Sequence, residues 1–420
     1  MNPGIALIQL VSEQAMPNLL AALALEPRLL IHLTTPKSHP VSARIAETCR
    51  RAALDLTHED IGLSSMPSLA ETRRAIGRAA RLATDAGLLP VLNFTGGTKL
   101  MSIGAWEEAR ASAMPSLYVD TQERRFWDGE TGDFSPFAAA LGDFDAAARK
   151  LRVDLVAFSN GVARTTAGCD PATLIPLADH LLRDQATERQ VWEAISGRSG
   201  FLAKALGGPA FSPRDANQIL YLYETTVEGL PPETADLAVA CGLLEETGEG
   251  IRIASVLDGI DVVAEAHQLL SQRFEKAEYR QRLTRLRNAA QLPLNFLSGA
   301  WLEVAAADAM NRGGRFHDVR WSVQVGDKDG YDLEEDVIAL DGVRLAYVSC
   351  KRSGRLHAHA EEIRARANRI GGIFSSCYYV IHELPYGAAK EDLLERCRQL
   401  GGIRVIPSSE LLGPNPFDHA

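Results

Sequence analysis

The 420-residue sequence lacks a long apolar stretch, since it contains no run of 18 or more apolar residues. A helix needs about 20 such residues to cross a bilayer, so we expect no membrane-spanning segment. The opening residues, MNPGIALIQLVSEQ, also lack the basic start, long apolar core and small-residue cleavage site of a secretion signal. These absences predict a cytoplasmic protein that has no membrane partner.

Cysteine is scarce, and its spacing is irregular. The sequence has six cysteines and no C-x-x-C pair. This spacing argues against a zinc site or a disulfide framework, and it fits a reducing cytoplasm. The six are Cys49, Cys169, Cys241, Cys350, Cys377 and Cys397.

Positive charge is in deficit, because 54 acidic residues outnumber 44 basic ones and leave a net charge of −10. A protein that coats nucleic acid relies on a basic surface, so the balance argues against that class. An enzyme needs only a local basic groove, and acidic metal ligands would add to the negative total. Nucleic-acid chemistry therefore stays open.

The first 150 residues read as a Rossmann-like domain of the α/β class. Short apolar runs at 5–11, 28–33, 89–94 and 116–120 alternate with helical patterns, the longest of them at 68–86. Strands that alternate with helices of ten or more residues predict a parallel sheet with crossover helices.

Residues 151–290 form a helical middle region, with helical patterns at 176–194 and 214–229. Residues 233–253 then predict a helix that extends through Leu243-Leu244-Glu245-Glu246, a turn at Thr247-Gly248 and a short strand. A helix followed by a hairpin is how a winged-helix unit ends, and an irregular helical linker fits equally well. We assign no DNA-reading role here, because no recognition helix rich in lysine and arginine is visible.

Residues 291–420 predict a second, compact α/β domain. Its pattern gives one helix, three strands, a second helix and a fourth strand, in that order. The expected elements are at 297–312, 318–325, 334–340, 343–350, 357–370 and 377–382.

A candidate anion site follows the strand at 89–94. Thr95-Gly96-Gly97-Thr98-Lys99 leads into a helix, whose first N–H groups and dipole favour an anion, and Lys99 adds a full charge. The spacing is not that of a Walker P-loop. A glycine turn capped by threonine is the alternative, although polar residues at the end of a strand have little packing purpose. The candidate ligand-binding residues are Ser12, Glu13, Gln14, Thr34, Asn93, Thr95, Gly96, Gly97, Thr98 and Lys99.

A carboxylate–lysine group is expected in the last domain. The turn at Asp341-Gly342 joins two antiparallel strands, which brings Asp336 and Lys351 to the same end of the sheet, and Glu303 lies on the preceding helix. Hard oxygen ligands hold Mg²⁺ or Mn²⁺, and an ammonium group neutralises charge, as phosphodiester hydrolysis requires. The alternative is a solvated acidic turn and a surface lysine.

A basic segment begins at the same lysine. In an acidic protein this local excess suits a phosphate backbone, whereas i,i+4 pairing along a helix is the alternative. Its members are Lys351, Arg352, Arg355, Arg364, Arg366 and Arg369.

Two sets of motifs resemble a known family. Residues 93–101 (NFTGGTKLM) resemble the N-x-T-G-G-T-K-x-M signature of CARF (CRISPR-associated Rossmann fold) domains. Residues 299–303 (GAWLE), 334–337 (EEDV) and 349–351 (SCK) look like the G-x-W-L-E, N-E-x-D-V and (E/S)-C-K motifs of PD-(D/E)xK, or restriction-endonuclease-like, nucleases fused to such domains. In this order, the motifs resemble the CARF-type effector nucleases of type III CRISPR systems.

The resemblance implies an endonuclease that is activated by a cyclic oligoadenylate, in particular cyclic tetra-adenylate, bound across a homodimer. The substrate would be DNA, RNA or both, cut largely independently of sequence. By motif position, Glu303 and Asp336 would bind Mn²⁺ or Mg²⁺, the carbonyl of Cys350 would touch the metal, and Lys351 would be the catalytic lysine.

The sequence departs from the motif at two positions. Ser349 stands where the second acid of (D/E)-x-K is usual, so the site would lean on Glu303 and on Glu334 or Glu335. Leu333 replaces an asparagine. Two alternatives therefore stay open: a nucleotide-sensing regulator with an inactive nuclease-like domain, and a CARF-like domain that slowly cleaves its own ligand.

Overall fold

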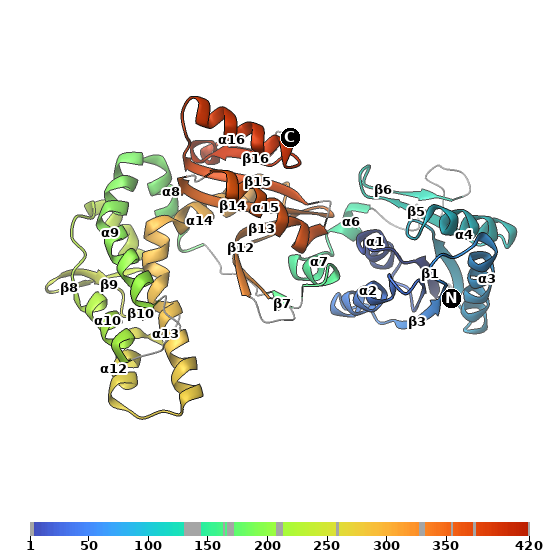
Figure 1. The fold of residues 1–420 in the computed structure, drawn as a ribbon, viewed down its shortest axis with the longest axis horizontal. Helices are drawn as coiled ribbons and strands as arrows, with labels where there is room; N and C mark the ends of the chain where they lie inside the picture. The colour runs from blue at the N-terminus through green and yellow to red at the C-terminus, as the bar shows by residue number, and fades with distance from the viewer. Residues whose placement is uncertain are drawn as a thin grey trace.

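The computed structural model describes residues 4–129, 144–162, 164–165, 172–206, 213–257, 260–326, 332–353, 356–372 and 375–418. Three parts lie in a row (Figure 1). The N-terminal sheet occupies one end, the helices from the middle of the chain occupy the other, and the C-terminal sheet lies between them. Among the described residues, no helix is both long enough and apolar enough to span a membrane.

The N-terminal part has the Rossmann-like fold that the sequence predicts. Its sheet has the order β3-β2-β1-β4-β5-β6; the first five strands are parallel, and β6 is antiparallel to β5. The elements are β1 (Ile5–Leu10), α1 (Met16–Leu25), β2 (Leu29–Thr34), α2 (His39–Arg51), β3 (Thr57–Gly62), α3 (Leu69–Asp85), β4 (Leu89–Asn93), α4 (Lys99–Ala111), β5 (Ser116–Asp120) and β6 (Arg125–Asp128).

Alternate residues of β1 face opposite sides of this sheet, as strand geometry requires. Ile8 and Leu10 pack in a cluster with apolar residues of α3 and α4. Leu7 packs on the other side, with residues of α1 and α2. Gln9 faces that same side as a fully buried polar residue.

The middle region contains the expected helix and hairpin, but the helix ends earlier than predicted. α11 stops at Ala240, and Leu244–Thr247 forms β8, which pairs antiparallel with β9. Gly242 has φ +73 and donates its N–H to the carbonyl of Val239, so a glycine C-cap ends the helix there. The elements are α6 (Phe144–Ala148), α7 (Val153–Ser159), β7 (Arg164–Thr165), α8 (Ile175–Arg183), α9 (Gln185–Leu206), α10 (Pro213–Glu224), α11 (Pro232–Ala240), β8 (Leu244–Thr247), β9 (Gly250–Ile253), β10 (Val256–Leu257), β11 (Ile260–Asp261), α12 (Val262–Ser271) and α13 (Lys276–Asn295).

The C-terminal part is a six-stranded sheet of order β16-β15-β14-β13-β12-β7. β12, β13 and β14 are antiparallel neighbours, and β15 and β16 continue the sheet in parallel with β14. The elements are η1 (Phe296–Ala300), α14 (Trp301–Arg312), β12 (His317–Gly326), β13 (Asp332–Asp341), β14 (Arg344–Ser353), α15 (Leu356–Gly371), β15 (Ser376–Glu383), α16 (Ala388–Gln399), β16 (Arg404–Pro407) and η3 (Ser408–Leu412).

The two sheet domains share one hydrophobic core. A single cluster of buried residues includes Leu19 and Ile45 from the N-terminal domain, Val156 from α7, and Ile338 and Tyr379 from the C-terminal sheet. The backbone N–H of Val153 also donates to Asp318 at 2.6 Å, which ties α7 to β12. Close packing and this hydrogen bond therefore join the two sheet domains.

Candidate functional site

The structure brings Asp336 and Lys351 together at the end of the β13–β14 pair, as the sequence predicts. The two strands are antiparallel, with Val337 opposite Val348, so Asp336 and Ser349 come next along the ladder. Lys351 Nζ donates to Asp336 Oδ2 at 3.0 Å. The Cys350 backbone N–H and the Ser349 hydroxyl donate to the same oxygen, at 2.7 and 3.2 Å. Three donors thus fix one oxygen of Asp336.

Glu303 reaches this group from α14. Trp321 Nε1 on β12 donates to Glu303 Oε2 at 2.8 Å, which orients the carboxylate. Burial, followed by the negative charge of Asp336, raises the pKa of Glu303 to about 8. A carboxylate whose pKa is raised by burial and by a neighbouring carboxylate lies close to that neighbour in a site of low polarity, which is common where groups are arranged for function.

Lys351 is an ammonium group at neutral pH. Burial alone would lower the pKa of Lys351, but the charge of Asp336 and its hydrogen bond outweigh that effect and raise it. Burial also raises the pKa of the Cys350 thiol, which therefore stays neutral inside the core. Cys350 touches Asp336 through its backbone N–H, and its side chain packs in the apolar cluster around α14.

The two glutamates before Asp336 face opposite sides of β13. Glu335 is buried, accepts from Tyr347 at 2.7 Å and pairs with Arg366 at 3.0 Å. Glu334 lies on the same side as Asp336, accepts from Ser322 and contributes to the raised pKa of Glu303. Of the two acids that the sequence offered in place of Ser349, only Glu334 faces the site.

Most arginines of the basic segment make contacts within the protein. Arg352 pairs with the buried Glu188 at 2.7 Å and with Glu383 at 3.0 Å. Arg364 donates to the carbonyls of Leu400 and Ser375, and Arg366 pairs with Glu335 and Glu362. Arg355 lies outside the described residues, and Arg369 makes contacts within the protein. Arg352, Arg364 and Arg366 are thus engaged within the protein, and the i,i+4 pairing that the sequence left open is present between Arg366 and Glu362.

The candidate anion loop has the predicted position, between β4 and the start of α4. Thr98 caps α4, since its hydroxyl accepts from the N–H of Met101. Thr98 and Lys99 are exposed at the helix N-terminus. Gly97 has φ +77, and a Cβ on Gly96 would lie 2.0 Å from the Leu10 carbonyl oxygen, so both glycines are required by the loop itself.

The candidate residues that follow β1 and the one at the end of β2 differ in their exposure to solvent. Glu13 and Gln14 are exposed, and Glu13 pairs with Lys37 at 3.0 Å. The Ser12 hydroxyl bonds to the backbone of Gln14 within the same turn. The candidate Thr34, by contrast, is buried.

Asn93 and Thr95 hold the loop from inside. The Asn93 side chain is fully buried, and its Oδ1 accepts from both the N–H and the hydroxyl of Thr95. Its Nδ2 donates to Asn18 Oδ1 at 3.3 Å, and Thr95 Oγ1 accepts from the N–H of Val119. The interpretation that polar residues at this strand end have little packing purpose is wrong, because both have a structural role.

A comparison with family models gives a match over residues 6–129, to the model described as the Card1 CARF domain. The match covers the whole N-terminal sheet and the glycine loop. The N-terminal domain is a CARF domain. The motif at 93–101 thus predicted the family of this domain from its loop.

Solved structures resemble the chain beyond its CARF domain. Can2 from Sulfobacillus thermosulfidooxidans, in complex with cyclic tetra-adenylate, matches with a TM-score of 0.59 at 19% identity, over 97% of this chain and 96% of that one. Protein VC1899 from Vibrio cholerae matches with a TM-score of 0.66 at 11% identity, over 98% and 96%. A search of curated proteins found no match.

A third structure is a type III CRISPR defence DNA nuclease activated by cyclic oligoadenylate. It matches with a TM-score of 0.50 at 17% identity, over 93% of this chain and 47% of that one. At these identities the likeness concerns the fold. For the first two structures it extends over nearly the whole length of both chains.

Proposed function

We propose that the chain is a metal-dependent endonuclease that a cyclic oligoadenylate, most directly cyclic tetra-adenylate, switches on. The observation that carries this proposal is the meeting of Glu303, Asp336 and Lys351 at one end of the C-terminal sheet, in a chain that also has a CARF domain. The substrate is DNA, RNA or both. Two similar structures, one bound to cyclic tetra-adenylate and one a nuclease activated by cyclic oligoadenylate, support it.

The carboxylates suit Mg²⁺ or Mn²⁺. Glu303 and Asp336 each have one oxygen held by protein donors, and among the described residues nothing bonds to the other. These hard oxygen atoms, together with the carbonyl of Cys350, are the ligands that such ions prefer. When bound, the ion would activate water and stabilise charge on the phosphate. A dication would also relieve the repulsion that raises the pKa of Glu303.

The remaining groups orient the reactants and the metal ligands. Lys351, held at 3.0 Å from Asp336, keeps its ammonium charge and orients the attacking water or neutralises charge that develops on the phosphate. Ser349 replaces an acid, and its hydroxyl donates to Asp336, so it supports a ligand instead of being a charged one. Glu334, on the same side of β13, supplies further negative charge.

The activator binds the CARF domain. The exposed N-terminus of α4 and Lys99 provide donors and positive charge for phosphate groups, and two CARF domains facing each other in a homodimer would complete a ring-shaped site. The ligand shifts the population toward the active arrangement, because it binds that arrangement better. The shared core between the two sheet domains carries the shift.

The test is cleavage of labelled DNA and RNA by the purified chain with Mn²⁺ or Mg²⁺. Cutting is expected only when metal and cyclic tetra-adenylate are both present. Lys99→Glu should raise the activator concentration that gives half-maximal cleavage about tenfold or more, because of charge repulsion at the helix N-terminus. Glu123→Lys, a charge change at an exposed residue of the same domain, is the control, and it should change neither the cleavage rate nor the activator concentration that is needed for cleavage.

Two other outcomes would contradict the proposal. Binding of nucleotide and of promoter DNA without any strand cleavage would favour a regulator with an inactive nuclease-like domain, which the serine at position 349 motivates. Degradation of the cyclic ligand that continues in Lys351→Ala would assign the chemistry to the CARF domain instead.

A further inference from the structure

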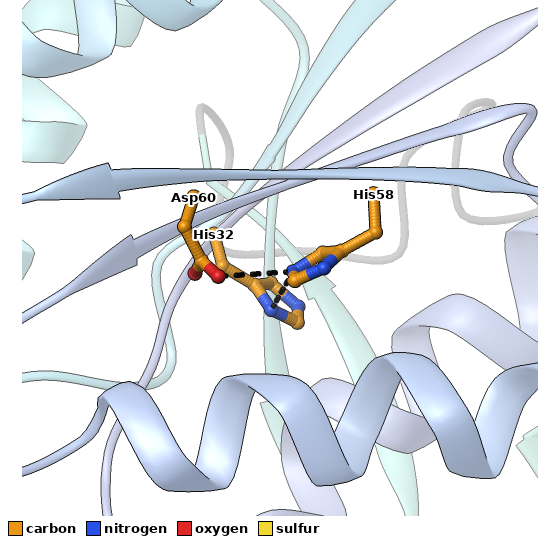
Figure 2. A group of neighbouring side chains, drawn as sticks. All are labelled: His32, His58 and Asp60. Atoms are coloured by element: carbon orange, nitrogen blue, oxygen red, sulfur yellow. Dashed lines mark hydrogen bonds and ion pairs between the residues drawn. The ribbon is translucent and has the colours of Figure 1, made fainter.

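A second group of potential metal ligands lies inside the CARF domain. His32 is on β2, and His58 and Asp60 are on the neighbouring strand β3 (Figure 2). Their ligand atoms all lie within 4.8 Å of one another. The parallel register places His32 opposite Asp60, and His58 is two residues earlier on the same face of β3. Ser42, on α2, closes the group from the other side.

Hydrogen bonds fix the tautomer of His32. Gln9 Nε2 donates to the carbonyl of Asn18 at 2.8 Å, so Gln9 Oε1 must face His32 Nε2, which lies 3.0 Å away. A carbonyl oxygen only accepts, so the proton of a neutral His32 is on Nε2. His32 Nδ1 is therefore a lone pair that points into the group.

The group has fewer hydrogen-bond donors than its short contacts require. His32 Nδ1 lies 2.7 Å from Ser42 Oγ, and that hydroxyl lies 2.6 Å from Asp60 Oδ1. One hydroxyl proton cannot serve both acceptors. His58 Nε2, at 3.0 Å from His32 Nδ1 and 3.1 Å from Ser42 Oγ, has only one proton to share between them. One short contact is thus left between two lone pairs, unless a cation occupies the centre.

The centre of this group is enclosed by the protein. His32 is fully buried. His39, the other histidine near this group, lies 3.8 Å from Asp60 and is largely exposed, so it stands outside the cluster.

We propose that His32, His58 and Asp60 bind a zinc ion, with the Ser42 oxygen or a water molecule as fourth ligand. Two imidazole nitrogens and a carboxylate are a ligand set that zinc accepts in tetrahedral geometry. Zn–N bonds of about 2.0–2.1 Å put ligand atoms about 3.3 Å apart. Two of the three separations are close to this value, at 3.0 Å between the two histidines and 3.7 Å between His58 and Asp60, and the third is at most 4.8 Å, so side-chain movements would complete the geometry.

The surroundings support a metal ligand. A histidine that binds a metal usually donates its other N–H to an oxygen, as His32 does to Gln9. The chain of contacts continues through Asn18 to Asn93, which holds the glycine loop. The ion would therefore be a structural site that braces β2 and β3, linked to that loop through Gln9, Asn18 and Asn93. This proposal does not depend on the nuclease function.

The experiment measures zinc bound to the full-length chain after chelator treatment and dialysis against micromolar Zn²⁺. A Glu303→Gln/Asp336→Asn background removes the nuclease site from the measurement. We expect a single zinc ion per chain in this background. His58→Ala and, separately, Asp60→Asn should weaken zinc binding by at least about tenfold, and should remove the visible absorption bands of tetrahedral Co²⁺ substituted for zinc.

His267→Ala provides the matched control, because His267 is an exposed histidine on α12, and it should keep the zinc. Asp60→Asn preserves the shape of the side chain, so it decides the question if His58→Ala fails to fold by circular dichroism. A chain that binds no zinc at micromolar concentration, or equal zinc content in every variant, would overturn the proposal.

Discussion

Replacing Asp336 by asparagine is expected to reduce the rate of nucleic-acid cleavage about a thousandfold, which corresponds to about 4 kcal/mol of transition-state stabilisation. Asp336 is the centre of the site, where Lys351 and two further donors meet on one of its oxygens. The amide keeps the shape and removes the charge, so metal binding and the placement of Lys351 fail together. Initial rates with saturating activator and Mn²⁺ provide the measurement.

The matched control is Asp308→Asn, on the same helix as Glu303. Asp308 pairs with Arg312 within α14 at 2.7 Å, and this partly exposed pair contributes little. Its cleavage rate should stay within about twofold of the wild type. Equal rates in Asp336→Asn and wild type would show that the chemistry lies elsewhere.

Replacing Arg352 by methionine is expected to lower the free energy of unfolding by about 3–5 kcal/mol, because it leaves a buried carboxylate without its main partner. Arg352 bonds to both oxygens of Glu188, which is 2% exposed, and its guanidinium lies over Trp192 at 4.5 Å. Burial would raise the pKa of Glu188, but contacts from His382 and Arg352 outweigh it and lower the pKa. Urea denaturation gives the measurement.

The pH dependence of the stability that the Arg352–Glu188 pair contributes follows from the lowered pKa of Glu188. The stability that the pair contributes is present at neutral pH and is lost as the pH falls through the pKa of Glu188 in the folded state. The difference between Arg352→Met and wild type should therefore shrink in acid. Arg398→Met, which breaks an exposed pair with Glu395, should cost at most about 1 kcal/mol. Equal losses for the two variants would contradict a structural role for Arg352.

The members of the carboxylate–lysine group could be located from the sequence to different degrees. The hairpin at Asp341-Gly342 was enough to place Asp336 near Lys351, because a tight turn fixes the register of the strands that it joins. Glu303 was placed by the motif, since the sequence does not state which side of the sheet α14 covers. Trp321, which orients Glu303 from β12, was not identified.

Other features depend on contacts between distant segments. β3 went unrecognised because its sequence, THEDIG, is mostly exposed and lacks an apolar pattern. His32 and His58 are 26 residues apart and become neighbours only when β2 pairs with β3. A signal did exist, because His32 interrupts the buried strand LLIHLT. A polar residue in a strand that is otherwise apolar needs a partner.

For the arginines after Lys351, by contrast, the sequence suggested a binding surface that the structure does not show. Their spacing suggested a surface for phosphate, whereas Arg364 donates to backbone carbonyls and Arg366 neutralises the buried Glu335. Charge counts along the sequence do not distinguish an arginine that faces solvent from one that satisfies a buried acid. Under the proposed function, contacts to a substrate backbone come largely from other residues.

Manganese binding tests most directly whether Glu303 and Asp336 share one divalent ion. The titration uses a His58→Ala chain, which leaves the histidine cluster out, and follows free Mn²⁺ by electron paramagnetic resonance. We expect a Mn²⁺ ion whose affinity falls at least about tenfold in either Glu303→Gln or Asp336→Asn, with no further large loss when both are combined, since each is needed for the same ion. Unchanged Mn²⁺ affinity in the combined variant would contradict the site.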